Sequence, residues 1–184
     1  MLEIEVKYRV GSFDPIRRRL AEWGAEPLGT RTDEDRYFNA PDRDFRATGE
    51  ALRLRRIAEE NRLTYKGPRI ERQTKTRPEI EVVIAPGEAS AADLARLLSA
   101  LGYRPAGLVR KSRERYQLRR DGFAVEISLD LLEGIGRFAE LEIVAPEDQL
   151  ERARGVLLGA AGELGLGEPE QRSYLEMVLE REEG

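Results

Sequence analysis

Polar and apolar residues alternate strictly at the start of the chain. Residues 2–7 read LEIEVK, which has the two-residue period of a β-strand with one apolar and one charged face. Residues two apart on a strand lie about 7 Å apart on the same side. Glu3, Glu5 and Lys7 therefore form a short row of two acids and one base.

The same alternation recurs along the chain and predicts eight strands. They cover residues 1–10, 28–38, 51–55, 63–66, 75–84, 108–118, 125–130 and 138–143. Apolar residues at helical spacing predict helices over residues 14–24, 90–102, 147–164 and 173–180. Hairpin signals such as Asp121-Gly122 favour antiparallel pairing, with the turn before the fourth strand placed at Glu60 and Asn61. No linker or low-complexity stretch interrupts the pattern, so we expect a single α+β domain over residues 1–184.

The charged face of these strands carries acids and bases in nearly equal number. The acids are Glu3, Glu5, Glu79, Glu81, Glu126, Asp130, Glu140 and Glu142, and the bases are Lys7, Arg53, Arg55, Lys66, Lys75, Arg77, Lys111 and Arg113. An ordinary sheet with this face in water is one interpretation. Because the face is rich in Arg and Glu and almost lacks Ser, Thr and Asn, we favour an eight-stranded antiparallel β-barrel, a tunnel with a charged lumen and helices packed outside.

Composition excludes several kinds of chemistry. The chain contains no cysteine and no histidine, which excludes disulfides, Ser-His-Asp catalysis and zinc held by Cys or His. A metal site must then be built from carboxylates, which favours Mg²⁺ or Mn²⁺. The absence of cysteine fits a cytoplasmic protein.

The net charge of −4 and the lack of a basic arm argue against nucleic acid and anionic membranes as partners. We also expect neither a membrane-spanning segment nor a signal peptide.

A charged lumen favours a ligand that is both anionic and metal-bound. Buried charges must be paired or must coordinate a metal. A polyphosphate with Mg²⁺ or Mn²⁺ meets both conditions, because arginines bind phosphate oxygens in a fork and carboxylates hold the metal. No Gly-rich phosphate loop is present in the sequence, so P-loop chemistry is not expected.

Glu3-Ile4-Glu5-Val6-Lys7 resembles the ExExK signature of the CYTH superfamily, the triphosphate tunnel metalloenzymes. Further segments match this superfamily in order along nearly the whole chain. They are Asp35-Arg36-Tyr37-Phe38, Leu52-Arg53-Leu54-Arg55, Thr64-Tyr65-Lys66-Gly67, Arg77-Pro78-Glu79-Ile80-Glu81, Lys111-Ser112-Arg113, Asp130, and Phe138-Ala139-Glu140-Leu141-Glu142. The segments at residues 41–45 and 173–175 are most similar to the class IV adenylyl cyclase group.

The resemblance implies roles for particular residues. It implies divalent metal ligands at Glu3, Glu5, Asp130, Glu140 and Glu142. It implies catalytic and triphosphate-binding cations at Lys7, Arg53, Arg55, Lys66, Lys111 and Arg113. It extends the substrate-binding set to Arg77, Glu79 and Glu81, where the two glutamates would ligate metal, orient the bases or pair with Arg77. A homodimer is also implied.

The resemblance leaves the reaction open. A class IV adenylyl cyclase would convert ATP to cyclic AMP and pyrophosphate, through attack of the ribose 3′-hydroxyl on the α-phosphorus. An inorganic triphosphatase or a thiamine-triphosphatase-type enzyme would direct water at the terminal phosphorus with the same residues. A non-catalytic polyphosphate-binding module is a further alternative, which the many acids make less favourable. The expected ligand is a nucleoside triphosphate or another inorganic or organic triphosphate.

Overall fold

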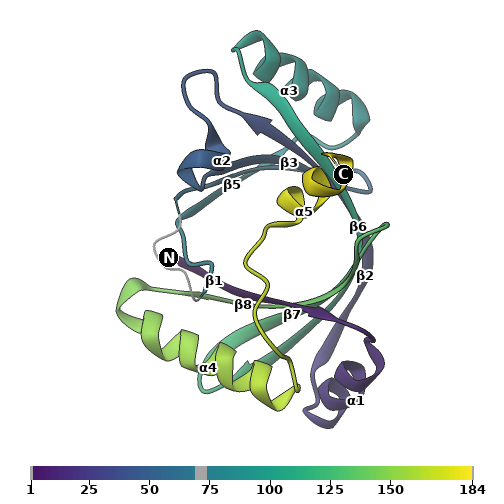
Figure 1. The fold of residues 1–184 in the computed structure, drawn as a ribbon, viewed down its shortest axis with the longest axis vertical. Helices are drawn as coiled ribbons and strands as arrows, with labels where there is room; N and C mark the ends of the chain where they lie inside the picture. Colours follow the sequence, from purple (N-terminus) through teal and green to yellow (C-terminus); the bar gives the residue numbers. More distant parts are fainter. Residues whose placement is uncertain (1, 69–73, 184) are drawn as a thin grey trace. The chain divides into compact units, whose positions relative to one another are not determined.

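The computed structural model describes residues 2–68 and 74–183. Hydrogen bonds link eight antiparallel strands in the order β1-β8-β7-β6-β2-β3-β4-β5 (Figure 1). The strands are β1 Leu2–Val10, β2 Glu26–Asn39, β3 Ala51–Ile57, β4 Glu60–Lys66, β5 Glu79–Ile84, β6 Arg104–Arg120, β7 Phe123–Leu132 and β8 Gly136–Ala145. The helices are α1 Asp14–Glu22, α2 Phe45–Thr48, α3 Glu88–Ala100, α4 Leu150–Glu163 and α5 Tyr174–Glu183, with a 3₁₀ turn at Glu147–Gln149. The predicted α+β class and the eight antiparallel strands are confirmed.

The described residues form two compact units. The first unit comprises residues 2–31, 74–77 and 112–171, and the second comprises residues 32–68, 78–111 and 172–183. Strands β2 and β6 contribute one end to each unit. Each unit therefore has its own strands, its own helices and its own apolar core.

In the first unit, β8 is paired on both sides. Its register with β1 runs from Leu2 opposite Ala145 to Val10 opposite Arg137, and its other edge pairs with β7. The apolar face of these strands packs under α1 and α4 (Figure 1). The core includes Ile4, Val6, Ile127, Leu141, Ile143, Leu20 and Leu157, all of them buried.

The second unit contains consecutive antiparallel pairs, β2 with β3, β3 with β4, and β4 with β5. Its core joins Phe38, Leu52 and Leu54 of the strands to Ala91 and Leu98 of α3. Leu52 and Leu54 alternate with Arg53 and Arg55, as the sequence predicts. The arginines consequently lie on the face of β3 opposite to this core.

Two local predictions differ from the structure. The hairpin turn between β3 and β4 lies at Ala58 and Glu59, not at Glu60 and Asn61, because the buried Asn61 side chain is used to donate hydrogen bonds to the carbonyls of Ala85 and Gly87. The segment after Asn39, where the sequence predicts neither a helix nor a strand, contains the short helix α2, whose first turn is capped by the Asp44 side chain.

The predicted strand over residues 75–84 has two different partners. The backbone of Lys75 and Arg77 donates to the carbonyls of Glu5 and Glu3 on β1, whereas β5 begins at Glu79 and pairs with β4. The expectation that helices cover the apolar face does not hold for β5, where Ile80 and Val82 are 62% and 51% exposed. Among residues 2–68 and 74–183, no helix is long and apolar enough to cross a membrane.

Candidate active site

The charged faces of the strands are withdrawn from solvent. Glu3 is 6% exposed, Lys7 2% and Asp130 0%, although each alternates with core residues that are also buried. A sheet with one face in water would leave these side chains exposed. The structure therefore encloses these three side chains, whereas Glu81 of the predicted set is exposed and Glu126 and Glu142 are half-buried.

Strand register in the first unit places carboxylates directly opposite one another. Glu5 lies opposite Glu142, and Glu142 lies opposite Glu126 on the next strand. One step along the strands, Lys7 lies opposite Glu140 and Glu140 opposite Ser128. Like charges directly opposite each other destabilise a sheet, so the row of Glu5, Glu142 and Glu126 requires positive charge nearby.

Arg115 donates to both carboxylate oxygens of Glu126 at 2.9 Å, and three further cations of the first unit lie near the other acids of these strands. Lys75 Nζ lies 3.3 Å from Glu5 Oε1. Arg113 forms a two-pronged ion pair with Asp130, at 2.7 Å from Nε to Oδ1 and 2.6 Å from Nη2 to Oδ2, and its Nη2 also lies 3.2 Å from Glu140. Lys7 is the third cation. Burial and the neighbouring Lys75 lower the pKa of the Lys7 ammonium well below its ordinary value, against the opposing effect of Glu5 and Glu140.

The predicted metal ligands suit a hard divalent cation by their chemistry. Four of them, Glu3, Glu5, Asp130 and Glu140, are buried carboxylates on the strands β1, β7 and β8. Carboxylate oxygens are the ligands that Mg²⁺ and Mn²⁺ prefer. Within the described residues, no three acidic side chains are already arranged to hold a metal ion. Glu5, Asp130 and Glu140 instead engage Lys75 and Arg113, so a bound metal would compete with these ion pairs for carboxylate oxygens.

The second unit contains a separate buried network around Asp35 of β2. Arg55 donates from Nε to Asp35 Oδ1 at 2.6 Å and from Nη2 to Oδ2 at 2.7 Å. Lys111 Nζ donates to Asp35 Oδ2 at 3.1 Å and lies 3.6 Å from Asp33 Oδ2. Arg53 Nη1 lies 3.8 Å from Asp35 Oδ2. Burial alone would raise the pKa of the Asp35 carboxyl, but Lys111, Arg53 and Arg55 lower it well below its ordinary value.

The remaining predicted substrate-binding residues make pairs of their own. Lys66 Nζ lies 2.7 Å from Glu79 Oε2. Glu81 accepts hydrogen bonds from Arg62 at 2.9 Å and from Thr64 at 3.1 Å. Arg77 is buried in the first unit and donates its backbone N–H to Glu3. Glu79 and Glu81 thus contact basic or hydroxyl groups of β4.

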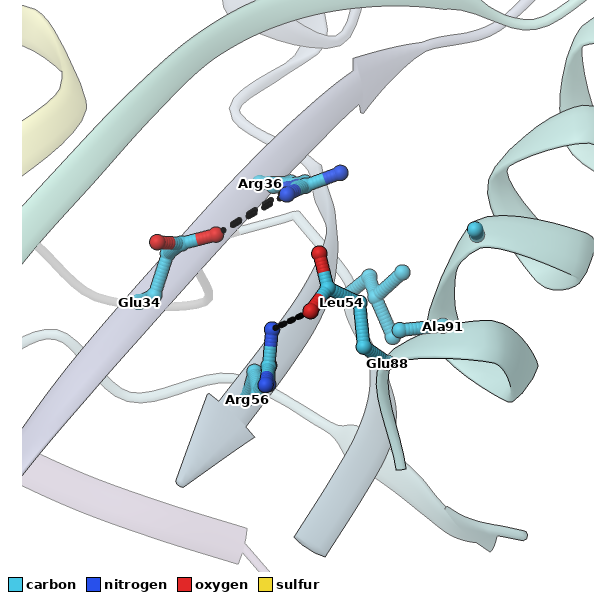
Figure 2. Close-up of a pocket in the computed structure, with 7 residues that line it drawn as sticks. Glu34, Arg36, Leu54, Arg56, Glu88 and Ala91 are labelled. Atoms are coloured by element: carbon cyan, nitrogen blue, oxygen red, sulfur yellow. Dashed lines mark hydrogen bonds and ion pairs between the residues drawn. The ribbon is translucent and has the colours of Figure 1, made fainter. Parts of the chain in front are cut away.

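The opposite face of β2 and β3 offers a small pocket of different character. Figure 2 shows Glu34 paired with Arg36 and Arg56 paired with Glu88, beside Leu54 and Ala91. The cavity volume is about 40 Å³, too small for a nucleotide. Its charges neutralise each other, so the enclosed face of the strands is the better candidate for a functional site.

Asp33 and Asp35 are the residues that sequence reasoning did not assign. Asp35 belongs to a segment that matches the CYTH superfamily, but the resemblance gives it no role, and Asp33 lies outside the matching segments. The available signal was their spacing, since two acids at i and i+2 on a strand point to the same face. Their partners come from β3 and β6, which only the strand order brings beside β2.

The fold and the buried charged faces define a CYTH domain. The chain matches the CYTH domain family over residues 1–174 and belongs to that family.

Individual relatives agree with this assignment. A relative from Methanocaldococcus jannaschii, provisionally named an adenylate cyclase, is 39% identical over 142 residues, or 77% of each chain. Adenylate cyclase CyaB from Aeromonas hydrophila is 31% identical over 176 residues, which cover 94% of this chain and 86% of that one. The structure of the PH1819 protein from Pyrococcus horikoshii is similar with a TM-score of 0.84 at 39% identity, and the match covers 97% of this chain and 99% of that chain.

Proposed function

We propose that the protein is a divalent-metal-dependent enzyme acting on a triphosphate, and that its reaction is the conversion of ATP to cyclic AMP and pyrophosphate. The observation that carries the proposal is the row of Glu5, Glu142 and Glu126 across three strands, in which Glu5 is buried and the other two are half-buried, because such a row of like charges suits metal binding better than it suits folding. The relatives named as adenylate cyclases support the choice of reaction.

In this proposal the metal is held by the five acids that the resemblance to the CYTH superfamily implies, Glu3, Glu5, Asp130, Glu140 and Glu142. Bound Mg²⁺ or Mn²⁺ would supply charge neutralisation at the phosphates and would lower the pKa of the ribose 3′-hydroxyl. Lys75 and Arg113 hold part of this acidic set in the structure. They would keep those carboxylates oriented before substrate arrives.

The cations bind the phosphates. Lys7, Arg53, Lys66 and Lys111 are buried or nearly buried, so their attraction to phosphate oxygens is weakly screened. The 3′-hydroxyl gives up its proton to water, its oxygen attacks the α-phosphorus to form a new P–O bond, and the bond from the α-phosphorus to the oxygen that bridges it to the β-phosphorus breaks. The negative charge that develops on the leaving pyrophosphate is stabilised by these fixed cations, an electrostatic role that requires no covalent intermediate.

The first experiment incubates purified protein with ATP, and separately with inorganic tripolyphosphate, in Mg²⁺ or Mn²⁺, and resolves products by chromatography. Cyclic AMP and pyrophosphate from ATP would support the proposal. Orthophosphate from either substrate without cyclic AMP would replace it with a triphosphatase. Binding of tripolyphosphate without any turnover would favour a non-catalytic module.

Variants test the acidic set directly. Glu3→Gln and Glu5→Gln should lower turnover by about 100- to 1,000-fold, because a catalytic metal supplies several kcal/mol of transition-state stabilisation. Glu34→Gln is the matched control and should retain wild-type turnover. Glu34 lies on the face of β2 opposite to the enclosed charges, and its ion pair with Arg36 is more exposed. Unchanged turnover in both acidic variants would refute the metal assignment. The homodimer and the cytoplasmic location stay predictions.

A further inference from the structure

We propose that Asp35 is a positioning residue that fixes the cations of the second unit for catalysis, a role that rests on the proposed triphosphate chemistry. Asp35 is fully buried and contacts Arg55, Lys111 and Arg53 from two different strands. It is the shared counter-ion of three cations. Any displacement of its carboxylate would move all three.

The geometry of Arg55 distinguishes it from a phosphate ligand. Its Nε and Nη2 both donate to Asp35 in a parallel fork, and its Nη1 lies 3.5 Å from Asp33 Oδ2. All three nitrogens of the guanidinium thus face aspartate oxygens. A guanidinium that binds phosphate would use the same two parallel N–H groups. Because those groups of Arg55 are bonded to Asp35, the structure assigns Arg55 to holding Asp35 rather than to binding substrate.

Arg53 and Lys111 lie farther from Asp35 than Arg55 does. Arg53 Nη1 is 3.8 Å from Asp35 Oδ2, and Arg53 Nη2 donates to the Thr64 hydroxyl at 3.4 Å. Lys111 lies between Asp35, Asp33 and the ring of Tyr174, whose centroid is 5.4 Å from Nζ. These contacts fix the direction of the ammonium, since an ammonium over an aromatic face is attracted to it.

The charge balance of this network suits a polyanion. Three cations, Arg53, Arg55 and Lys111, lie 2.6 to 3.8 Å from the carboxylate oxygens of Asp33 or Asp35, so the network gathers positive groups that a polyanion would attract. Without Asp35 the three cations would repel one another and separate. The affinity for a polyanion would persist because the positive charge would remain, but the alignment of the cations would be lost.

The test compares binding with turnover in three variants. Asp35→Asn removes the counter-charge, Arg55→Lys keeps the charge but removes the fork, and Glu34→Gln changes the neighbouring residue on the opposite face. Titration calorimetry with sodium tripolyphosphate measures binding. Steady-state kinetics with the triphosphate that the wild type turns over measures kcat and KM, at a temperature where each variant is folded by circular dichroism.

Asp35→Asn and Arg55→Lys should bind tripolyphosphate within about threefold of wild type or tighter, because the number of phosphate-facing cations is unchanged. Their kcat should fall about 10- to 100-fold, the cost of small misplacements of catalytic groups. Glu34→Gln should match wild type in both. If Asp35→Asn does not fold, Arg55→Lys decides the outcome.

Three results would overturn the proposal. A wild-type kcat in Asp35→Asn would show that its carboxylate does not align the cations. A joint loss of binding and kcat in Arg55→Lys would show that Arg55 contacts phosphate. If the wild type neither binds tripolyphosphate nor turns over any triphosphate, the proposed function fails and the positioning role fails with it, whereas the first two results leave the proposed function intact.

Discussion

Replacing Arg113 by Met tests whether the enclosed charges are truly dehydrated. Arg113 donates two short hydrogen bonds to Asp130, which is 0% exposed, and lies near Glu140. Methionine fills much of the same volume but leaves both acids without this guanidinium. Removal of one partner of a buried ion pair costs about 3–5 kcal/mol, so the free energy of unfolding should fall by that amount.

The assay is urea unfolding followed by circular dichroism, in metal-free buffer. Arg19→Met is the control, because Arg19 and Glu22 form an exposed pair on α1, and such pairs contribute about 0–1 kcal/mol. The double variant Arg113→Met/Asp130→Asn should recover part of the lost stability, since it removes the buried unpaired charge as well.

The same variant connects stability to metal binding. Asp130 and Glu140 lose the cation that competes for their oxygens, so Mn²⁺ should raise the unfolding midpoint of Arg113→Met more than that of the wild type. If Arg113→Met loses less than about 1 kcal/mol, as an exposed pair would, the charges are hydrated and the reasoning from burial is refuted.

Two further predictions concern the second unit. The Asp35 carboxyl has a lowered pKa in the folded protein, so its contribution to stability is fully present above about pH 4, the ordinary value, and is lost as the pH falls toward the folded value. Urea midpoints between pH 6 and pH 2 should decline less steeply in Asp35→Asn, and equal slopes would contradict this. Gly107→Ala should destabilise the protein by about 1–3 kcal/mol, because the added Cβ would lie 2.5 Å from Leu175 Cδ1 of α5; unchanged thermal melting would show that α5 shifts freely.

The sequence predicts the fold well where polar and apolar residues alternate regularly. The alternation at residues 2–7 and 138–143 places Glu5 and Glu142 on charged faces, and the register then sets them opposite each other. The Asp121-Gly122 turn is also predictable, since both residues adopt positive φ and this dipeptide favours that conformation.

Other features depend on partners distant in the chain. The pairing of Arg55 with Asp35 is decided by the neighbour that β2 selects, and alternation does not identify a neighbour. The exposure of Ile80 and Val82 depends on which strands the helices cover, which an apolar pattern on β5 does not reveal. Ala58 adopts φ of +51° without being glycine, so its turn carries no clear residue signal.

The pairing of β1 with β8 has a consequence for synthesis on the ribosome. Leu2 lies opposite Ala145, so once β1 is translated it must wait for this partner through 143 further residues. At about 5–20 residues per second, that delay is roughly 7–30 s. During this time Ile4 and Val6 lack the β8 residues that complete their core, and folding chaperones would encounter the nascent chain with one edge of β1 still unpaired.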